Sequence, residues 1–151
     1  VCVLCNNNKK GKFHMSINVE YLEKCIATLE KARTAIKTAN EGSIDYEMYR
    51  NSLVKGFEIT LEQAGKLLKK RITPFFATKK SVDTLNFKDL FRYANKFSLI
   101  NMEETERWLH YRDNRNSTAH DYGRAFAEET LSLVDDFLAD AKHLKDVIAN
   151  G

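Results

Sequence analysis

Cysteine is scarce in this chain of 151 residues, which contains three. Three thiols do not provide the disulfide framework of a small secreted domain, so we place the protein in the cytoplasm. Cys2 and Cys5 have the C-x-x-C spacing of half a zinc site, but a structural zinc needs four ligands and no second pair follows. We therefore expect neither a metal nor another cofactor.

Proline and glycine are also rare, with one proline and six glycines. A sheet of many strands needs frequent turns built from these residues, so the composition favours an all-α fold. No run of about 18 apolar residues occurs, and we expect no membrane span. The net charge of +3 is mild, so any cationic surface must come from local clustering.

The length predicts one domain, which we assign to residues 15–150. Residues 6–12 are polar and lack a repeating pattern, and the apolar run before them is too short for a signal peptide. We interpret residues 1–14 as a disordered or non-native leader.

Apolar residues then recur at spacings of three and four, which predicts an antiparallel up-and-down bundle of four or five helices. The first helix ends near Gly42, and the second covers residues 44–71. Residues 72–84 are expected to form a loop. Asn86 and Asn101 begin the third and fourth helices as N-caps, and the fifth covers residues 125–149. The buried stripe predicted for the fifth helix consists of Leu131, Val134, Leu138, Ala141, Lys145 and Ile148.

Residues 108–122 have the most unusual composition in the chain. Four residues of this stretch share one face of the fourth helix, namely Trp108, Tyr111, Arg112 and Arg115. The tryptophan indicates that this face is buried, yet arginines are rarely buried without a partner. Either the two arginines pair with acids such as Glu58 or Asp121, or they line a cleft that receives an anion.

Arg115 and His120 are five residues apart, which in a continuous helix would separate their directions by roughly 140°. The chain must therefore turn between them if both contact one ligand. Asn116 and the two hydroxyl residues that follow compete for backbone hydrogen bonds, which favours such a turn. The spacing thus indicates a helix end where Arg115, Asn116, His120 and Tyr122 face a shared space.

These groups suit the cleavage of RNA through its own 2′-hydroxyl. Histidine can act as base or acid, and arginine binds phosphate oxygens in a bidentate manner. Asn116 would orient the phosphate or hydroxyl, and Tyr122 would stack on a base or hydrogen-bond phosphate. One histidine cannot be acid and base at once, so we expect a two-fold dimer in which two copies meet.

Structural roles compete with these assignments. His120 can instead cap a helix or satisfy a buried polar group, and Arg112 can be a structural ion-pair partner. Arg107 and Arg124 are interpreted as solvated or substrate-steering charges, and Arg124 joins Arg112 and Tyr122 as candidate substrate-binding residues. The cationic run at residues 66–71 either binds RNA phosphates or complements the dipole of the second helix.

The spacing of Arg115, His120 and Tyr122 resembles the R-x4-H-x-Y signature of HEPN domains, small helical proteins encoded beside minimal nucleotidyltransferases. Trp108 and the segment 55–58 resemble the nucleotidyltransferase substrate-binding branch of that family. The resemblance covers residues 15–148.

The resemblance implies a homodimer that cuts RNA without metal and acts as the toxin of a toxin–antitoxin pair. Arg115 and His120 would be catalytic and Asn116 supportive. A partner nucleotidyltransferase would neutralise the toxin by attaching AMP to Tyr122. The alternative is a non-catalytic subunit that binds substrate for, or regulates, such a nucleotidyltransferase.

Overall fold

The computed structural model describes residues 16–117 and 124–150, without the side chains of residues 116, 117, 124 and 126. Every regular element in these ranges is helical, so the all-α prediction is confirmed. The elements are α1 (Glu20–Thr38), α2 (Ile44–Ile72), the 3-10 helix η1 (Thr73–Phe75), α3 (Lys79–Asp83), α4 (Phe87–Lys96), α5 (Met102–Ser117) and α6 (Arg124–Ala149). The leader predicted for residues 1–14 and the pair Cys2 and Cys5 lie outside the described residues.

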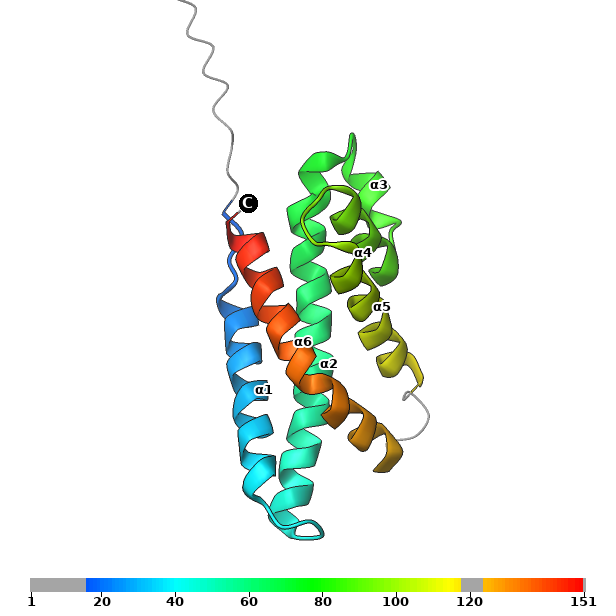
Figure 1. The fold of residues 1–151 in the computed structure, drawn as a ribbon. Helices are drawn as coiled ribbons and strands as arrows, with labels where there is room; N and C mark the ends of the chain where they lie inside the picture. The colour runs from blue at the N-terminus through cyan, green and yellow to red at the C-terminus, as the bar shows by residue number, and fades with distance from the viewer. Residues whose placement is uncertain (1–15, 118–123, 151) are drawn as a thin grey trace, which may run out of the picture.

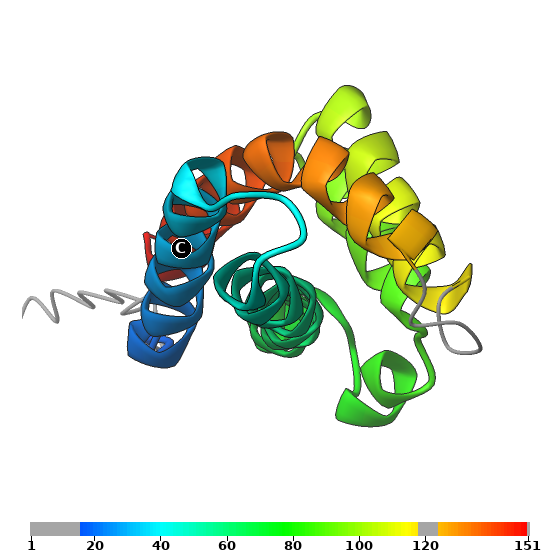
Figure 2. The ribbon, with the colours of Figure 1, turned by 90° about the horizontal axis from the view of Figure 1, so that it is seen from below.

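Helix α2 is the central element of the bundle. Seen along its axis, α2 lies between α1 on one side and α4 and α5 on the other, and α6 crosses from the α1 side to the α5 side (Figure 2). The long helices α1, α2, α5 and α6 alternate in direction, as an up-and-down bundle requires (Figure 1). At 29 residues α2 is long enough to contact α1, α4, α5 and α6 in turn. None of the described helices has the length and apolar character of a membrane span.

Side-chain caps fix the starts of α2, α3, α4 and α5. The hydroxyls of Ser43 and Thr78, which the sequence interpretation did not name as caps, accept from backbone N–H groups at the starts of α2 and α3. Asn86, the predicted N-cap of α4, accepts at 2.8 Å and forms a capping box with Asp89. Asn101, the other predicted N-cap, accepts from the third residue of α5. Both predicted caps are confirmed because capping is a local interaction.

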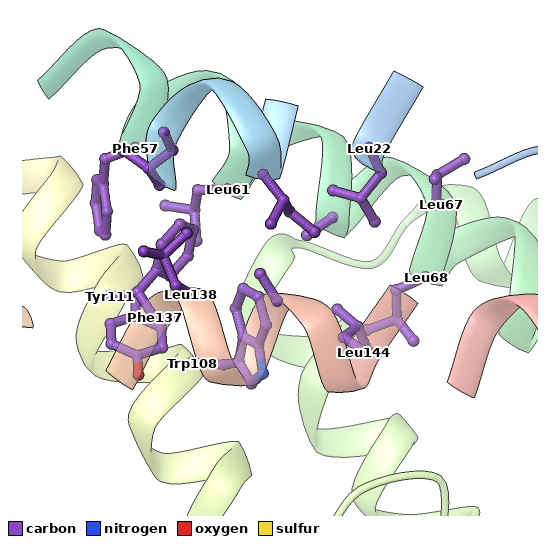
Figure 3. Packing of buried hydrophobic residues seen from close by; sticks show 14 of the residues in the cluster. Leu22, Phe57, Leu61, Leu67, Leu68, Trp108, Tyr111, Phe137, Leu138 and Leu144 are labelled. Atoms are coloured by element: carbon purple, nitrogen blue, oxygen red, sulfur yellow. The ribbon is translucent and has the colours of Figure 1, made fainter. Parts of the chain in front are cut away.

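The core is unusually aromatic where α2, α4, α5 and α6 meet. Trp108 and Tyr111 of α5 are 0% and 1% exposed, which confirms the buried face predicted for that helix. Trp108 stacks on Phe91 with ring centroids 4.7 Å apart, and Tyr111 contacts the edge of Phe137 at 5.0 Å. Phe57 of α2 packs on Phe137 at 4.5 Å (Figure 3). Together these rings hold α5 in a fixed rotation against α2 and α6.

Two sequence predictions differ from the structure. Residues 72–84 contain η1 and α3 rather than an irregular loop, with Pro74 inside η1 and Val82 of α3 fully buried. One buried residue in five gives no periodic signal. The stripe of α6 also includes Phe137 and Leu144, both fully buried, whereas Lys145 is partly exposed and lies near Glu23.

Gly42 adopts the positive φ that its position suggested, with φ of +82°. It lies in the turn that connects α1 and α2, four residues after the end of α1 at Thr38. Most L-residues avoid this backbone conformation. Gly42 therefore shapes the turn rather than directly capping α1.

Candidate active site at the ends of α5 and α6

The candidate site lies where α5 ends and α6 begins. Arg115 is in the last turn of α5, which is described up to Ser117, and α6 starts at Arg124. Because α5 and α6 run in opposite directions, these two ends lie at the same end of the bundle (Figure 1). Helix α5 continues through Asn116 to Ser117, and residues 118–123 lie outside the described residues, so the turn predicted between Arg115 and His120 stays a prediction.

The described residues cover only part of the predicted site. His120 and Tyr122 lie outside them, as do the side chains of Asn116 and Arg124. The convergence of these groups with Arg115 thus stays a prediction. Arg112 and Arg115 are the candidate side chains whose surroundings the structure defines.

Two glutamates of α2 position Arg115. Its Nη2 donates to Oε1 of Glu62 at 3.4 Å, and its Nε lies 3.8 Å from Oε1 of Glu58. The Glu58 carboxylate is 7% exposed, and its other oxygen lies 3.5 Å from Nζ of Lys55. The Arg115 side chain keeps 28% of its surface in solvent. The predicted pairing with Glu58 is confirmed.

Glu62 is a partner that the sequence interpretation did not name. It follows Glu58 by four residues and therefore lies on the same face of α2. That spacing could have identified it once Glu58 was proposed. Both glutamates contact Arg115 from one helix, so α2 sets the direction of the cation at the end of α5.

Arg112 has a different environment. Its guanidinium carbon lies over the Phe87 ring, 5.0 Å from the centroid, in a cation–π contact. Phe87 in turn packs directly on Gly65 of α2, where an added Cβ would lie 2.9 Å from two ring carbons. The small residue in α2 therefore determines the ring position, and the ring determines where the half-buried Arg112 lies. Its role as a substrate-binding residue stays a prediction.

Arg107 is a structural residue, which corrects its interpretation as a solvated or steering charge. It donates two hydrogen bonds to the Asp140 carboxylate of α6, at 2.8 and 2.7 Å. The Tyr111 hydroxyl donates to the same carboxylate at 2.6 Å. These hydrogen bonds to Asp140 raise the pKa of Arg107, while burial, followed by the bond to Asp140, raises the pKa of Tyr111. Asp140 is 33 residues from Arg107 in the chain, so no local pattern could have identified this pair.

A second polar group links α5 to α6 near the other end of α5. The Glu104 carboxylate is buried and accepts from Nε1 of Trp108 at 3.3 Å. Its other oxygen lies 2.8 Å from Nδ1 of His143, which is on α6. His143 had no role in the sequence interpretation. Both polar groups fix α5 against α6, and so they fix the two helix ends that flank the candidate site.

No group of three or more histidine, cysteine, aspartate or glutamate side chains within residues 16–117 and 124–150 is placed to hold a metal ion. Among the described residues, the acids that contact Arg115 are Glu58 and Glu62, and both are used in contacts with cations. The chemistry available from the described side chains is therefore charge stabilisation by a positioned arginine.

The all-helical bundle, with an arginine at the end of α5 that begins an R-x4-H spacing, defines a HEPN-type helical protein. The chain belongs to the family described as nucleotidyltransferase substrate binding protein like, whose family model matches residues 17–150. This membership confirms the family that the sequence motif indicated.

Relatives with assigned names or solved structures agree with this fold. A Haemophilus influenzae protein named probable ribonuclease HepT is 27% identical over 132 residues, covering 85% of this chain and 89% of the relative. A solved H. influenzae structure, described as having the fold of a substrate binding domain of a nucleotidyltransferase, matches with a TM-score of 0.76. It is 27% identical and covers 87% of this chain and 98% of its own.

A crystal structure of a Thermus thermophilus protein matches with a TM-score of 0.65. It covers 82% of this chain and 94% of its own at 23% identity. This likeness supports the fold alone. Because the relatives are covered over nearly their whole length, the bundle described here is comparable in extent to theirs.

Proposed function

We propose that this protein is an endoribonuclease that cuts RNA with Arg115 and His120. The observation that carries the proposal is the position of Arg115, held at the end of α5 by Glu58 and Glu62 with its side chain partly exposed. It is followed in the sequence by a histidine at the HEPN spacing. The H. influenzae relative named probable ribonuclease supports the same activity.

In the proposed reaction the 2′-oxygen of the RNA attacks the adjacent phosphorus and the bond to the 5′-oxygen breaks. The products are a 2′,3′-cyclic phosphate and a free 5′-hydroxyl. A base accepts the proton of the 2′-hydroxyl, and an acid donates a proton to the leaving oxygen. Arg115 stabilises the negative charge that develops on the phosphoryl oxygens. His120 transfers a proton, and Asn116 orients the phosphate.

Each chain supplies one histidine at this motif, so we propose a homodimer in which the two copies of His120 act as acid and base. The chemistry assigned to Arg115 and His120 contains no step that needs a metal. Arg112, Tyr122 and Arg124 would contact the substrate near the cleaved bond.

We further propose that the protein is the toxin of a toxin–antitoxin pair whose partner is a minimal nucleotidyltransferase. The partner would transfer AMP from ATP to the Tyr122 hydroxyl, with release of pyrophosphate and of the hydroxyl proton, and so block the site. Co-expression with the nucleotidyltransferase followed by mass analysis of the tryptic peptide tests this step. An unmodified Tyr122 in the neutralised complex would contradict it.

A second function is a non-catalytic subunit that binds substrate for a nucleotidyltransferase. The solved H. influenzae structure favours it, since that relative is described as having the fold of a substrate binding domain of a nucleotidyltransferase. In this case the cationic end of α5 would bind a nucleotide or RNA without cutting it. The two functions differ in whether the purified chain alone cleaves RNA.

The test is cleavage of RNA by the purified protein at pH 6–8, with and without EDTA. We expect cleavage in both conditions. His120→Ala and Arg115→Ala should each lower the rate by at least about 100-fold, the usual contribution of a general acid or base or of a charge-stabilising donor. Arg115→Lys should restore little, because lysine lacks the planar pair of donors.

Lys31→Ala, at an exposed position on α1, is the matched control for the loss of one cation. It should cleave at the rate of the unmodified protein. Circular dichroism of each variant establishes that the helices are intact. RNA left uncut by the folded wild-type dimer under all these conditions would favour the non-catalytic function instead.

A further inference from the structure

An aromatic cluster lies at the surface where α2 ends and η1 follows. Phe75 of η1 is 48% exposed, and its ring stacks on Phe97 with centroids 4.5 Å apart and planes inclined by 12°. Phe76 contacts the edges of Phe97 and Tyr93 at 5.7 and 4.9 Å. The Phe75 ring is therefore held in a fixed plane by a second ring while half of its surface remains in water.

The same part of the chain is strongly cationic. Residues 63–98 contain nine lysines and arginines and two acids, which gives a formal charge of +7. The whole chain has +3, so the remaining residues sum to −4. The nine cations are Lys66, Lys69, Lys70, Arg71, Lys79, Lys80, Lys88, Arg92 and Lys96. The positive charge of this protein is thus concentrated on one part of the fold.

Helix electrostatics explain only some of these cations. Lys69, Lys70 and Arg71 occupy the last turn of α2, where the helix dipole favours positive charge. Lys79 and Lys80 belong to α3, a helix of five residues whose first and last turns overlap, so a helix dipole does not account for them. Both are exposed, and Lys79 has an electrostatic partner in Asp83 of the same helix. They add two cations to the exposed positive surface.

Cations and aromatic rings also contact each other at this surface. The Arg71 guanidinium lies 5.7 Å from the Phe75 centroid, and Nζ of Lys96 lies 5.6 Å from that of Tyr93. Exposed rings beside cations are the combination by which proteins bind single-stranded nucleic acid. The rings stack on unpaired bases and the cations contact phosphates. An acidic protein surface would match the charge but would give the stacked Phe75 no role.

We propose that this surface binds a single-stranded segment of the RNA substrate away from the cleavage site. We call it the Phe75 surface, and it consists of Arg71, Phe75, Lys79, Lys80 and Phe97. One base stacks on Phe75, and the lysines contact neighbouring phosphates. The inference rests on the proposed function in taking RNA as the substrate. A duplex is excluded, since its bases are already stacked and paired and so cannot stack on a side chain.

The Phe75 surface and the candidate active site are connected by α2. Arg71 follows Glu62, the partner of Arg115, by nine residues, which is roughly 14 Å along the helix. Helix α2 ends at the top of Figure 1 and α5 ends toward the bottom, so the two sites are distinct (Figure 1). Nine residues also rotate the two positions by about 180° around the axis of α2, so Arg71 and Glu62 lie on opposite faces of that helix.

The test measures binding rather than cleavage, so it stays informative if the protein proves not to be a nuclease. The probe is a fluorescently labelled 2′-O-methyl RNA of twelve mixed nucleotides, which lacks the attacking hydroxyl, and binding is followed by fluorescence anisotropy. We expect Phe75→Ala to weaken binding about tenfold, the usual loss when one base–aromatic stack is removed. Phe75→Tyr should bind like the wild type.

Lys79→Gln combined with Lys80→Gln should weaken binding and reduce the slope of log K against log salt by about 1.4, because two phosphate contacts are lost. Lys31→Gln combined with Lys37→Gln, both exposed on α1, removes the same charge and should leave that slope unchanged. The melting temperature of each variant checks that the fold is retained.

Binding unaffected by Phe75→Ala would overturn the proposal, even if the lysine variant binds less well. In the same assay, polyglutamate and unlabelled RNA are compared as competitors at equal total charge. If Phe75→Ala binds normally and the two competitors displace the probe equally well, the surface is instead assigned to an acidic protein partner. Equal binding of a hairpin duplex and the single strand would also contradict the proposal. Tight binding to the Phe75 surface without cleavage of unmodified RNA would refute the nuclease function alone.

Discussion

Removing the Tyr111 hydroxyl tests the hydrogen bonds to Asp140 that fix α5 against α6. That hydroxyl donates to Asp140 at 2.6 Å and the side chain is 1% exposed, so Tyr111→Phe deletes a buried hydrogen bond to a carboxylate. Such bonds contribute about 1.5–3 kcal/mol. Asp140 keeps its two bonds from Arg107, which places the expected loss in the lower part of that range, at about 1.5–2 kcal/mol.

The same contact makes this loss depend on pH. The pKa of Tyr111 is raised in the folded protein, first by burial and then by its bond to Asp140. The unfolded tyrosine releases its proton near about pH 10 while the folded one keeps it, so high pH favours the unfolded state. The stability that Tyr111 provides is therefore complete below pH 10 and declines above it, by about 1.4 kcal/mol at pH 11. Phenylalanine has no such dependence.

Urea unfolding of both proteins between pH 7 and 11 measures this prediction. At pH 7 the free energy of unfolding of the variant should be about 1.5–2 kcal/mol lower, and in a separate thermal scan the variant should melt about 3–8 °C lower. The two stability curves should then converge as the pH approaches 11. Tyr93→Phe on α4, half-buried, is the control and should change stability by less than about 0.5 kcal/mol. A difference between Tyr111→Phe and wild type that stays constant to pH 11 would refute the reasoning.

Two further predictions concern the contacts of α2. Gly65→Ala places a Cβ 2.9 Å from the Phe87 ring and should lower the free energy of unfolding by about 1–2 kcal/mol in thermal unfolding. Gly56→Ala is the control: its Cβ would lie 3.3 Å from a flexible leucine methyl, and the substitution should leave stability unchanged. Glu58→Gln removes the charge that positions Arg115 and should lower RNA cleavage about fivefold, corresponding to about 1 kcal/mol, with the melting temperature unchanged or raised. Cleavage equal to wild type would show that Glu58 does not position the arginine.

The sequence predicted the long helices well because their signals are local and repeated. The expected range 44–71 for α2 differs from the observed Ile44–Ile72 by one residue at its end. Capping residues such as Asn86 bond within three residues of themselves, so their role could be inferred without the rest of the fold. The short helix α3 was missed because five residues cannot show a period of 3.6.

The burial pattern of α6 was less predictable. Leu131 and Lys145 were assigned to its buried stripe but are only partly buried, whereas Phe137 and Leu144, which were not assigned to it, are fully buried. Helix α6 contacts α1, α2 and α5 along its length, so its apolar surface is wider than one stripe. Which residues of a wide face are most buried depends on those neighbours, and the periodicity of one helix does not contain that information.

In the candidate site, too, the sequence predicted features that depend on one helix and missed those that depend on contacts between helices. The phase of one helix was enough to place Trp108, Tyr111 and Arg115 on a common face, and the structure confirms it for the two buried aromatics. It could not separate the roles of the arginines, since each role depends on a partner from another helix. Arg107 is held by two short bonds to the buried Asp140, whereas Arg115 reaches Glu58 and Glu62 only at 3.8 and 3.4 Å. Exposure does not separate the two, since the side chain of Arg107 is 41% exposed and that of Arg115 is 28% exposed. They differ in their partners: Arg107 links α5 to α6 through a two-point ion pair, and Arg115 is oriented by the longer contacts to α2.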